Sequence, residues 1–385
     1  MKIADRAEAI TPFYAMEVLK AANEREASGE NVLHMEVGEP AGGAPNSVTE
    51  AAIAALANVG KLGYTEALGV SPLRNAIAAH YDRTYGVEVD PDRIVATTGS
   101  SGGFLLAFLA AFDAGDRVAL AAPGYPAYRN ILAALGIEAV ILPTGPQSRF
   151  QPTPEMLAEA ASSQRIDGLL IASPANPTGT MLDHDALGAL VDHCSEQDIR
   201  IISDEVYHGI TYGEDAETIV KLDDRAIAVN SFSKYFSMTG WRLGWMVLPQ
   251  ELIRPVERLA QNLFISPPTI SQQAAVAAFD AGDELKAKVA GYARNREMLL
   301  RELPLAGFDN LAPADGAFYI FADVRSLTND SAVFCKKMLA ETGVAATPGM
   351  DFDTDNGHAY IRFSFAGAYD DMLEAASRLK TWLKK

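Results

Sequence analysis

Short, largely apolar runs alternate with helical segments through most of the chain, and this alternation limits the possible folds more than any other feature. Continuous apolar runs are expected for strands that helices cover on both faces. The runs predict strands over 93–97, 117–121, 140–142, 168–172, 199–203, 226–230 and 244–248. Because helices are predicted between many of them, the pattern indicates an open α/β fold with a mostly parallel sheet flanked by helices.

The pattern changes after about residue 280. A long charged helix is predicted over 283–303 and a last helix over 369–383, with extended segments over 317–322, 343–346 and 358–363. A chain of 385 residues is long enough for two domains. We therefore predict a large α/β domain (36–280) and a smaller α+β domain (281–385), which an N-terminal arm (1–35) joins.

The charge balance excludes some classes of partner. The chain has 32 basic and 50 acidic residues and a net charge of -18, which repels phosphate backbones and anionic membranes. Nucleic acid and membranes are therefore not expected as partners. The first ten residues lack an apolar signal region, and no apolar run reaches the roughly 20 residues of a membrane span.

The cysteines and histidines show no pattern of a metal site. Cys194 and Cys335 are far apart in sequence, which indicates a reducing compartment, and the six histidines are scattered without metal-ligand spacing. We expect a cytoplasmic protein without a bound metal.

Polar residues cluster where five of the predicted strands end. The segments are Gly99-Ser100-Ser101-Gly102-Gly103, Gly124-Tyr125-Pro126, Asn176-Pro177-Thr178-Gly179, Asp204-Glu205-Val206-Tyr207 and Ser231-Phe232-Ser233-Lys234, with Arg242 a short loop later. Ligands of an open α/β sheet bind beyond the carboxyl ends of its strands, so these groups should converge on one crevice. The Gly/Ser loop opens a helix, whose amides would face an anion, although a tight strand-to-helix turn also accounts for its glycines.

Two ionisable residues stand in unusually apolar surroundings. Lys234 has aromatic neighbours, which should lower the pKa of its ammonium from about 10.4 and make it a nucleophilic amine. For a lysine considered by itself, the simpler interpretation is a structural one, in which the aliphatic chain is buried and the ammonium group is hydrated. Asp204 ends an apolar strand and needs a partner there, and a helix N-cap would also satisfy it.

The run from Ser231 to Gly244 resembles the cofactor-lysine signature of class I/II aminotransferases, which have fold type I and are similar to aspartate aminotransferase. The order of the Gly/Ser loop, Gly-Tyr-Pro, Asn-Pro-x-Gly, Asp-x-x-Tyr, Ser-x-Ser-Lys and Arg also resembles this family. The resemblance extends from Gly38 to Arg362. It implies that the large domain binds pyridoxal 5′-phosphate and that the protein is a transaminase.

The resemblance also implies roles for individual residues. Lys234 would hold pyridoxal phosphate as a Schiff base and then act as general acid and base, while Asp204 would pair with the pyridine nitrogen and make the ring an electron sink. Arg362 would bind the substrate α-carboxylate in a bidentate pair. By the same resemblance, Asn176 and Tyr207 would contact the 3′ oxygen of the cofactor, and Tyr125 would stack on the face of its ring. The backbone of Gly38 and the amide of Asn176 would contact the substrate. The residues implied around the phosphate are Ser100, Ser101, Gly102, Ser231, Ser233 and Arg242, together with Tyr64 from a second subunit.

By this resemblance the chain would move an amino group between an L-amino acid and a 2-oxo acid by a ping-pong mechanism, as a homodimer with shared active sites. An apolar wall is predicted from Phe13, Tyr14, Phe104, Phe264 and Phe318. No arginine is evident for a side-chain carboxylate, so neutral aliphatic or aromatic substrates are expected, with glutamate or alanine as the partner.

Three other functions are compatible with part of the sequence. A lyase that cleaves C–S bonds would share the same fold and motifs. The segment Gly99–Gly103 also fits the G-x-S-x-G elbow of a serine hydrolase, with Ser101 as nucleophile and Asp204 and His358 as partners, but this reading leaves Lys234 unexplained. A non-catalytic binding protein could have the same fold, although binding alone needs no reactive amine.

Overall fold

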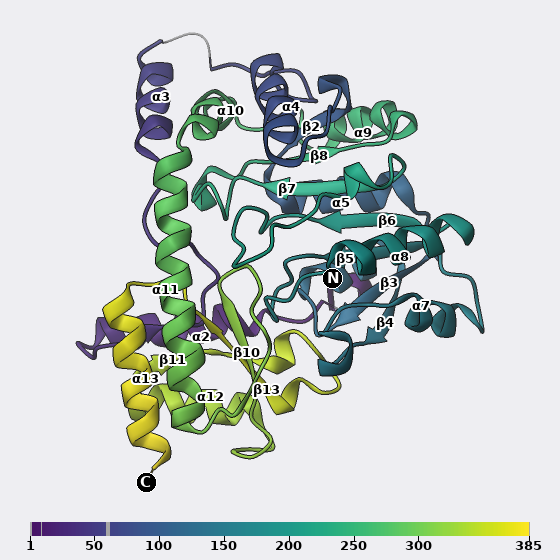
Figure 1. The fold of residues 1–385 in the computed structure, drawn as a ribbon. Coiled ribbons are helices and arrows are strands. Elements are labelled where there is room, and N and C mark those ends of the chain that lie inside the picture. Colours follow the sequence, from purple (N-terminus) through teal and green to yellow (C-terminus); the bar gives the residue numbers. More distant parts are fainter. Residues whose placement is uncertain (1, 9, 59–61, 385) are drawn as a thin grey trace.

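The computed structural model describes residues 2–8, 10–58 and 62–384, and its largest element is a seven-stranded sheet (Figure 1). The strands follow the order β2-β8-β7-β6-β5-β3-β4, and β8 alone runs antiparallel to its two neighbours. The strands are β2 (Ile94–Thr97), β3 (Arg117–Ala122), β4 (Glu138–Pro143), β5 (Gly168–Ala172), β6 (Arg200–Asp204), β7 (Ile227–Ser231) and β8 (Gly244–Val247). The predicted α/β fold with a mostly parallel sheet is confirmed.

Helices cover both faces of this sheet because successive strand residues point to opposite faces. Leu169 and Ile201 belong to one apolar cluster, whereas their chain neighbours Leu170 and Ile202 belong to the other. The first cluster includes residues of α3 (Asn46–Ala57), α4 (Ser71–Tyr85), α7 (Pro154–Ala161), α8 (His184–Glu196) and α10 (Thr269–Ala275). The second includes residues of α5 (Gly99–Ala111), α6 (Ala127–Leu135) and α9 (Gln250–Leu263).

The C-terminal part contains a second, antiparallel sheet, which lies below the large sheet in Figure 1. Its strands are ordered β12 (Thr347–Pro348), β13 (Tyr360–Ser364), β10 (Tyr319–Asp323) and β9 (Asn310–Leu311). The helices of this part are α11 (Gly282–Ala306), α12 (Ser331–Thr342) and α13 (Tyr369–Leu383), and α11 packs along α13.

The N-terminal segment contacts this C-terminal part. It contains α1 (Asp5–Glu8), α2 (Tyr14–Ala27) and β1 (Leu33–His34), and β1 pairs in parallel with β11 (Val344–Ala345). The pairing brings residues near 33 beside residues near 344. The division into domains at residues 35 and 280 stays a prediction.

The long charged helix extends further than the sequence indicated. It was predicted over 283–303, but α11 continues through Pro304 to Ala306 and ends where Gly307 takes a left-handed conformation, with φ of 107°. Proline disfavours a helix interior, which is why the prediction ends before it, whereas a C-terminal glycine supplies the usual stop. No helix in the described ranges is both long and apolar enough to cross a membrane.

Candidate active site

A cavity of about 220 Å³ lies beyond the carboxyl ends of the central strands. It brings together residues from the five segments that the sequence placed at strand ends, and it adds Gly38 and Arg362 from nearer the two ends of the chain. The predicted site residues that line it are Gly38, Ser100, Tyr125, Asn176, Asp204, Tyr207, Lys234 and Arg362. Of the predicted apolar wall, Phe13 and Phe104 line this cavity, whereas Phe264 lines a different hollow.

Lys234 follows β7 and reaches across the cavity with its amine. Its Nζ donates a hydrogen bond to the carbonyl of Gly38 at 2.5 Å and lies 5.9 Å from the ring centroid of Tyr207. Burial, together with the positive charges of Arg362 and Arg242, lowers the pKa of the amine to about 8. At pH 7 a pKa of about 8 leaves roughly a tenth of this amine uncharged and nucleophilic, far more than in an exposed lysine.

Asp204, the last residue of β6, is a buried carboxylate with two donors. Its Oδ1 accepts the backbone N–H of Val206 at 2.9 Å, and its Oδ2 accepts the hydroxyl of Tyr128. Burial raises the pKa of Asp204 to about 6, while the two donors and Lys234 oppose that shift. Sequence reasoning missed Tyr128; the available signal was a tyrosine in the first turn of the helix that follows Gly124-Tyr125-Pro126.

The guanidinium of Arg362, in β13, is hydrogen-bonded along its edges and packs against aromatic rings. Its Nη1 donates to Oδ1 of Asn176 at 2.9 Å, and its Nη2 donates to the carbonyl of Glu36 at 2.5 Å. The rings of Tyr319 and Phe352 lie 4.4 and 4.8 Å from its central carbon. Its buried Nε has no hydrogen-bond partner among the described residues, so a donor remains for a carboxylate ligand.

Tyr207 and Gly38 both contact Tyr319, which, like Tyr128, the sequence analysis did not indicate. The hydroxyls of Tyr207 and Tyr319 are hydrogen-bonded at 2.7 Å. A Cβ on Gly38 would lie 1.9 Å from the hydroxyl oxygen of Tyr319, so only glycine leaves room for that ring. The close approach of the backbone explains a glycine at this position.

Of the residues predicted around a phosphate, Ser100, Ser101 and Gly102 lie in the first turn of α5, and Arg242 packs against that turn. Gly99 has φ of 68°, and a Cβ there would lie 2.7 Å from Nη2 of Arg242, so the guanidinium packs against the helix N-terminus. Ser231 is buried, and its hydroxyl accepts the backbone N–H of Ser233 at 3.0 Å. A helix N-terminus with an arginine beside it is suited to an anion. Ser101, Gly102, Ser231, Ser233 and Arg242 do not line the 220 Å³ cavity itself.

Tyr64 lies apart from this cavity and is 84% exposed. It lines a shallow hollow of about 650 Å³ together with Leu62, Leu263 and Phe264. Its ring is therefore packed against little of its own chain.

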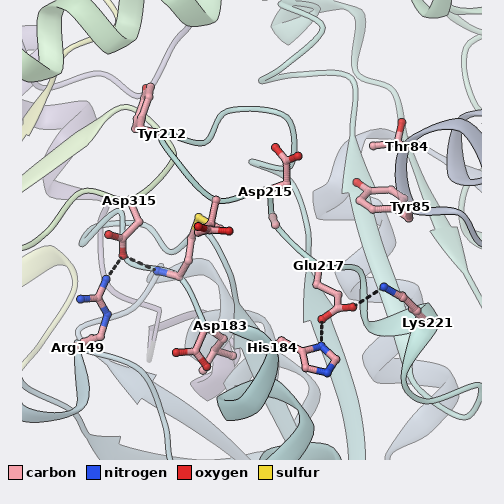
Figure 2. A pocket seen from close by; sticks show the side chains of 14 residues that line it. Thr84, Tyr85, Arg149, Asp183, His184, Tyr212, Asp215, Glu217, Lys221 and Asp315 are labelled. Carbon is pink, nitrogen blue, oxygen red and sulfur yellow. Dashed lines mark hydrogen bonds and ion pairs between the residues drawn. The ribbon is translucent and has the colours of Figure 1, made fainter.

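A larger cavity, of about 700 Å³, is formed largely by charged side chains (Figure 2). Its basic residues are already paired, since Arg149 contacts Asp315 at 2.6 Å and Glu217 contacts both His184 at 2.6 Å and Lys221 at 2.9 Å. It contains none of the predicted site residues. Its size alone does not make it the candidate site.

The residues of the hydrolase alternative do not come together in the described part of the chain. Ser101 is exposed outside the cavity, and His358 is exposed with its Nδ1 3.1 Å from the carbonyl of Asp355. Asp204 is engaged by Tyr128 and Val206 instead. A serine–histidine–aspartate relay needs hydrogen bonds between its members.

Comparisons with known proteins find relatives across nearly the whole chain. A family model described as aminotransferase class I and II matches residues 30–379. The chain is 53% identical over 378 residues to a valine–pyruvate aminotransferase of Mycobacterium tuberculosis, covering 97% of each. It is 35% identical over 378 residues to a (5-formylfuran-3-yl)methyl phosphate transaminase of Methanocaldococcus jannaschii, again covering 97% of each. The crystal structure of an aminotransferase from Mycobacterium tuberculosis superposes with a TM-score of 0.97 at 52% identity and covers 100% of this chain and 99% of that one.

Proposed function

Because this chain belongs to the class I and II aminotransferases, we propose that it transfers an amino group from a neutral L-amino acid such as valine to a 2-oxo acid such as pyruvate, by a ping-pong reaction. It is an aminotransferase and uses pyridoxal 5′-phosphate. One observation carries the proposed substrate class. Lys234 and Arg362 are the only cations among the described residues that line the cavity, and each already has a role, in the cofactor attachment and in α-carboxylate binding.

The rest of the cavity wall supports the same choice. Phe13, Met16, Val37 and Phe104 line the cavity with apolar groups. A substrate carboxylate placed against such a wall would lose its hydration without gaining a cation, whereas an aliphatic side chain would lose only contact with water.

The residues present fit the cofactor at several points. The amine of Lys234 offers a nucleophile, and the carboxylate of Asp204 offers a hydrogen-bond acceptor. The helix N-terminus at Gly99, with Arg242 packed against it, offers an anion site. When bound, pyridoxal phosphate supplies an aromatic ring that draws electrons away from the substrate Cα.

We assign each step to a group of this chain. Arg362 binds the substrate α-carboxylate and thereby orients the Cα–H bond. Lys234 would hold the cofactor covalently, and its Nζ is the base that would accept the Cα proton. Asp204 would hold a proton on the ring nitrogen, while Asn176 and Tyr207 would orient the 3′ oxygen.

The exposure of Tyr64 supports a homodimer with shared sites. An 84% exposed tyrosine beside Leu62 and Leu263 fits a surface that another protein covers. We propose that a second copy of this chain covers it and that the hydroxyl of Tyr64 reaches the phosphate in that copy.

The test of the substrate class is the half-reaction of the holoenzyme, followed by the absorbance of the bound cofactor. L-valine, L-alanine, L-glutamate and L-aspartate are compared as donors, with Lys234→Ala as the inactive control. We expect kcat/KM for valine to exceed that for aspartate by about tenfold or more. Equal efficiency with aspartate would contradict the proposed class, and release of a thiol with pyruvate and ammonia from C–S substrates would favour the lyase alternative.

A further inference from the structure

The helix α2 begins without a cap from its own sequence. Its N-cap residue, Phe13, has no side-chain acceptor for the free amides of the first turn. Asp351 supplies the acceptors from 336 residues further along the chain: its Oδ1 accepts the N–H of Tyr14 at 3.2 Å, and its Oδ2 accepts the N–H of Ala15 at 3.1 Å. The start of α2 is therefore held by a carboxylate of the C-terminal part.

The turn that Asp351 holds is a wall of the candidate active site. Phe13, Ala15 and Met16 all line the cavity that contains Lys234 and Arg362. The ring of Phe13 packs edge-on against Tyr125, with centroids 5.7 Å apart. The position of this wall relative to the substrate therefore depends on the hydrogen bonds made by Asp351.

Asp351 is also a buried carboxylate whose charge interacts with that of Arg362. Its side chain is only 2% exposed. Burial raises the pKa of its carboxyl, while the two backbone donors and the positive charges of Arg362 and Arg129 oppose that shift. The next residue, Phe352, packs on the guanidinium of Arg362 with 4.8 Å between its ring centroid and the central carbon. The same short segment thus contacts both the wall and the carboxylate-binding arginine.

We propose that Asp351 determines substrate specificity as a positioning residue, by holding the apolar wall of Phe13 and Met16 in place and by disfavouring a second substrate carboxylate with its charge. The inference rests on the proposed preference for neutral amino acids and names the residue responsible for it. A neutral side chain only has to pack against the wall. An acidic side chain would enter a partly desolvated site, and the carboxylate of Asp351 lies behind the wall of that site.

Two substitutions separate the charge of Asp351 from its role as a cap. Asp351→Asn removes the charge and keeps one oxygen that can accept from the first turn, where the carboxylate used two, and asparagine is itself a good helix cap. Asp351→Ala removes both. The probes are two unreactive carboxylates, isovalerate with one charge and succinate with two, titrated into the holoenzyme and followed by the absorbance of the bound cofactor.

For Asp351→Asn we expect succinate to bind about threefold tighter or more, because a repulsive charge is lost, while the affinity for isovalerate changes by less than about twofold. For Asp351→Ala we expect isovalerate to bind roughly fivefold more weakly, because the wall loses its cap. If the alanine variant does not fold, the ratio of the two affinities in the asparagine variant decides the question.

Asp330→Asn is the matched control. Asp330 caps α12 in the same part of the molecule by accepting the N–H groups of Ala332 and Val333, each at 3.0 Å, but no described residue of the helix that it caps lines the cavity. It should leave the ratio of succinate to isovalerate affinity unchanged. An unchanged ratio in Asp351→Asn, or an equal change in Asp330→Asn, would overturn the proposal. Because binding is measured without turnover, this result is separate from the donor comparison: a wild-type enzyme that prefers aspartate refutes the substrate class, whatever the ratio shows.

Discussion

The hydroxyl of Tyr128 donates a hydrogen bond to Oδ2 of Asp204, and the two residues are 76 positions apart in the chain. The first lies in the opening turn of α6 and the second at the end of β6. With Val206 at the other oxygen, each carboxylate oxygen has one donor from the protein and keeps acceptor capacity for a ligand. The arrangement stabilises the charged carboxylate against the effect of burial.

Removal of that hydroxyl should weaken the reaction without loss of the fold. In Tyr128→Phe the pKa of Asp204, already about 6, rises further because one donor to the charged form is lost. We expect kcat to fall about tenfold at neutral pH. The acid limb of the rate profile should move to higher pH, since a carboxyl with a raised pKa becomes protonated sooner as the pH falls.

Steady-state rates between pH 5 and 9 measure both effects, with the range chosen to span the shift that a raised carboxyl pKa predicts. The control is Tyr212→Phe, which removes a hydroxyl that donates to the carbonyl of Ala317 at 2.7 Å, outside the cavity. A Tyr128→Phe enzyme with an unshifted acid limb would show that this hydrogen bond does not tune Asp204.

Cofactor capture by the apoenzyme should depend on the ionisation of Lys234. Burial lowers the pKa of this amine to about 8, and only its neutral form attacks an aldehyde. The rate of covalent attachment should therefore rise with pH and reach half its plateau near pH 8. Stopped-flow absorbance after mixing apoenzyme with pyridoxal phosphate gives the profile.

Lys288→Ala is the control for this measurement, because Nζ of Lys288 also donates to a glycine carbonyl, that of Gly43 at 2.6 Å, but at a surface site. It should retain the profile, while Lys234→Ala should show no attachment. Covalent cofactor in the Lys234→Ala protein would assign the reactive amine elsewhere.

Replacement of Arg362 by lysine should weaken substrate binding. The guanidinium lies between two rings and presents an unpaired Nε, and a lysine ammonium has neither the planar faces nor the paired donors. For Arg362→Lys we expect KM for valine to rise roughly 10- to 100-fold, with a smaller effect on kcat.

Initial rates over a range of valine concentrations test this, with Arg325→Lys as control. Arg325 also lies over a tyrosine ring, that of Tyr360 at 5.1 Å, but pairs with Asp323 outside the cavity. An unchanged KM in Arg362→Lys would mean that another group binds the α-carboxylate.

A shared site makes a complementation experiment possible. Neither Lys234→Ala nor Tyr64→Ala homodimers should be fully active. In a mixed dimer, one of the two sites would combine an intact Lys234 with an intact Tyr64 from the other chain. With random exchange of subunits, half the dimers are mixed, so about a quarter of all sites should regain activity.

Activity after subunit exchange, compared with that of the two variants mixed without exchange, is the measurement. Tyr369→Ala replaces Tyr64→Ala in the control pairing, since Tyr369 stacks on Arg294 in the C-terminal part, away from the cavity. Exchange that restores nothing beyond the average of the two variants would refute the shared site.

The sequence predicted the strands well because the signals for strands are local. Each continuous apolar run became a strand of the large sheet, with small shifts such as 226–230 to Ile227–Ser231. Parallel strands end at the same edge of a sheet, and six of the residues that follow those runs therefore line the cavity: Ser100, Tyr125, Asn176, Asp204, Tyr207 and Lys234. The fold class and the convergence of Lys234 and Asp204 on one cavity could therefore be inferred from local signals, whereas the roles predicted for these two residues came from the resemblance to the family.

The sequence by itself determined which residues stand at the strand ends, and hence the kind of chemistry available. Only the tertiary structure decided the support behind them: the bond from Tyr128 to Asp204, the contact of Tyr319 with Gly38, and the cap that Asp351 forms on α2. These contacts join residues far apart in the chain, and they depend on strand order and on how the helices pack. Hydrophobic periodicity shows which face of an element is buried but not which distant element it meets.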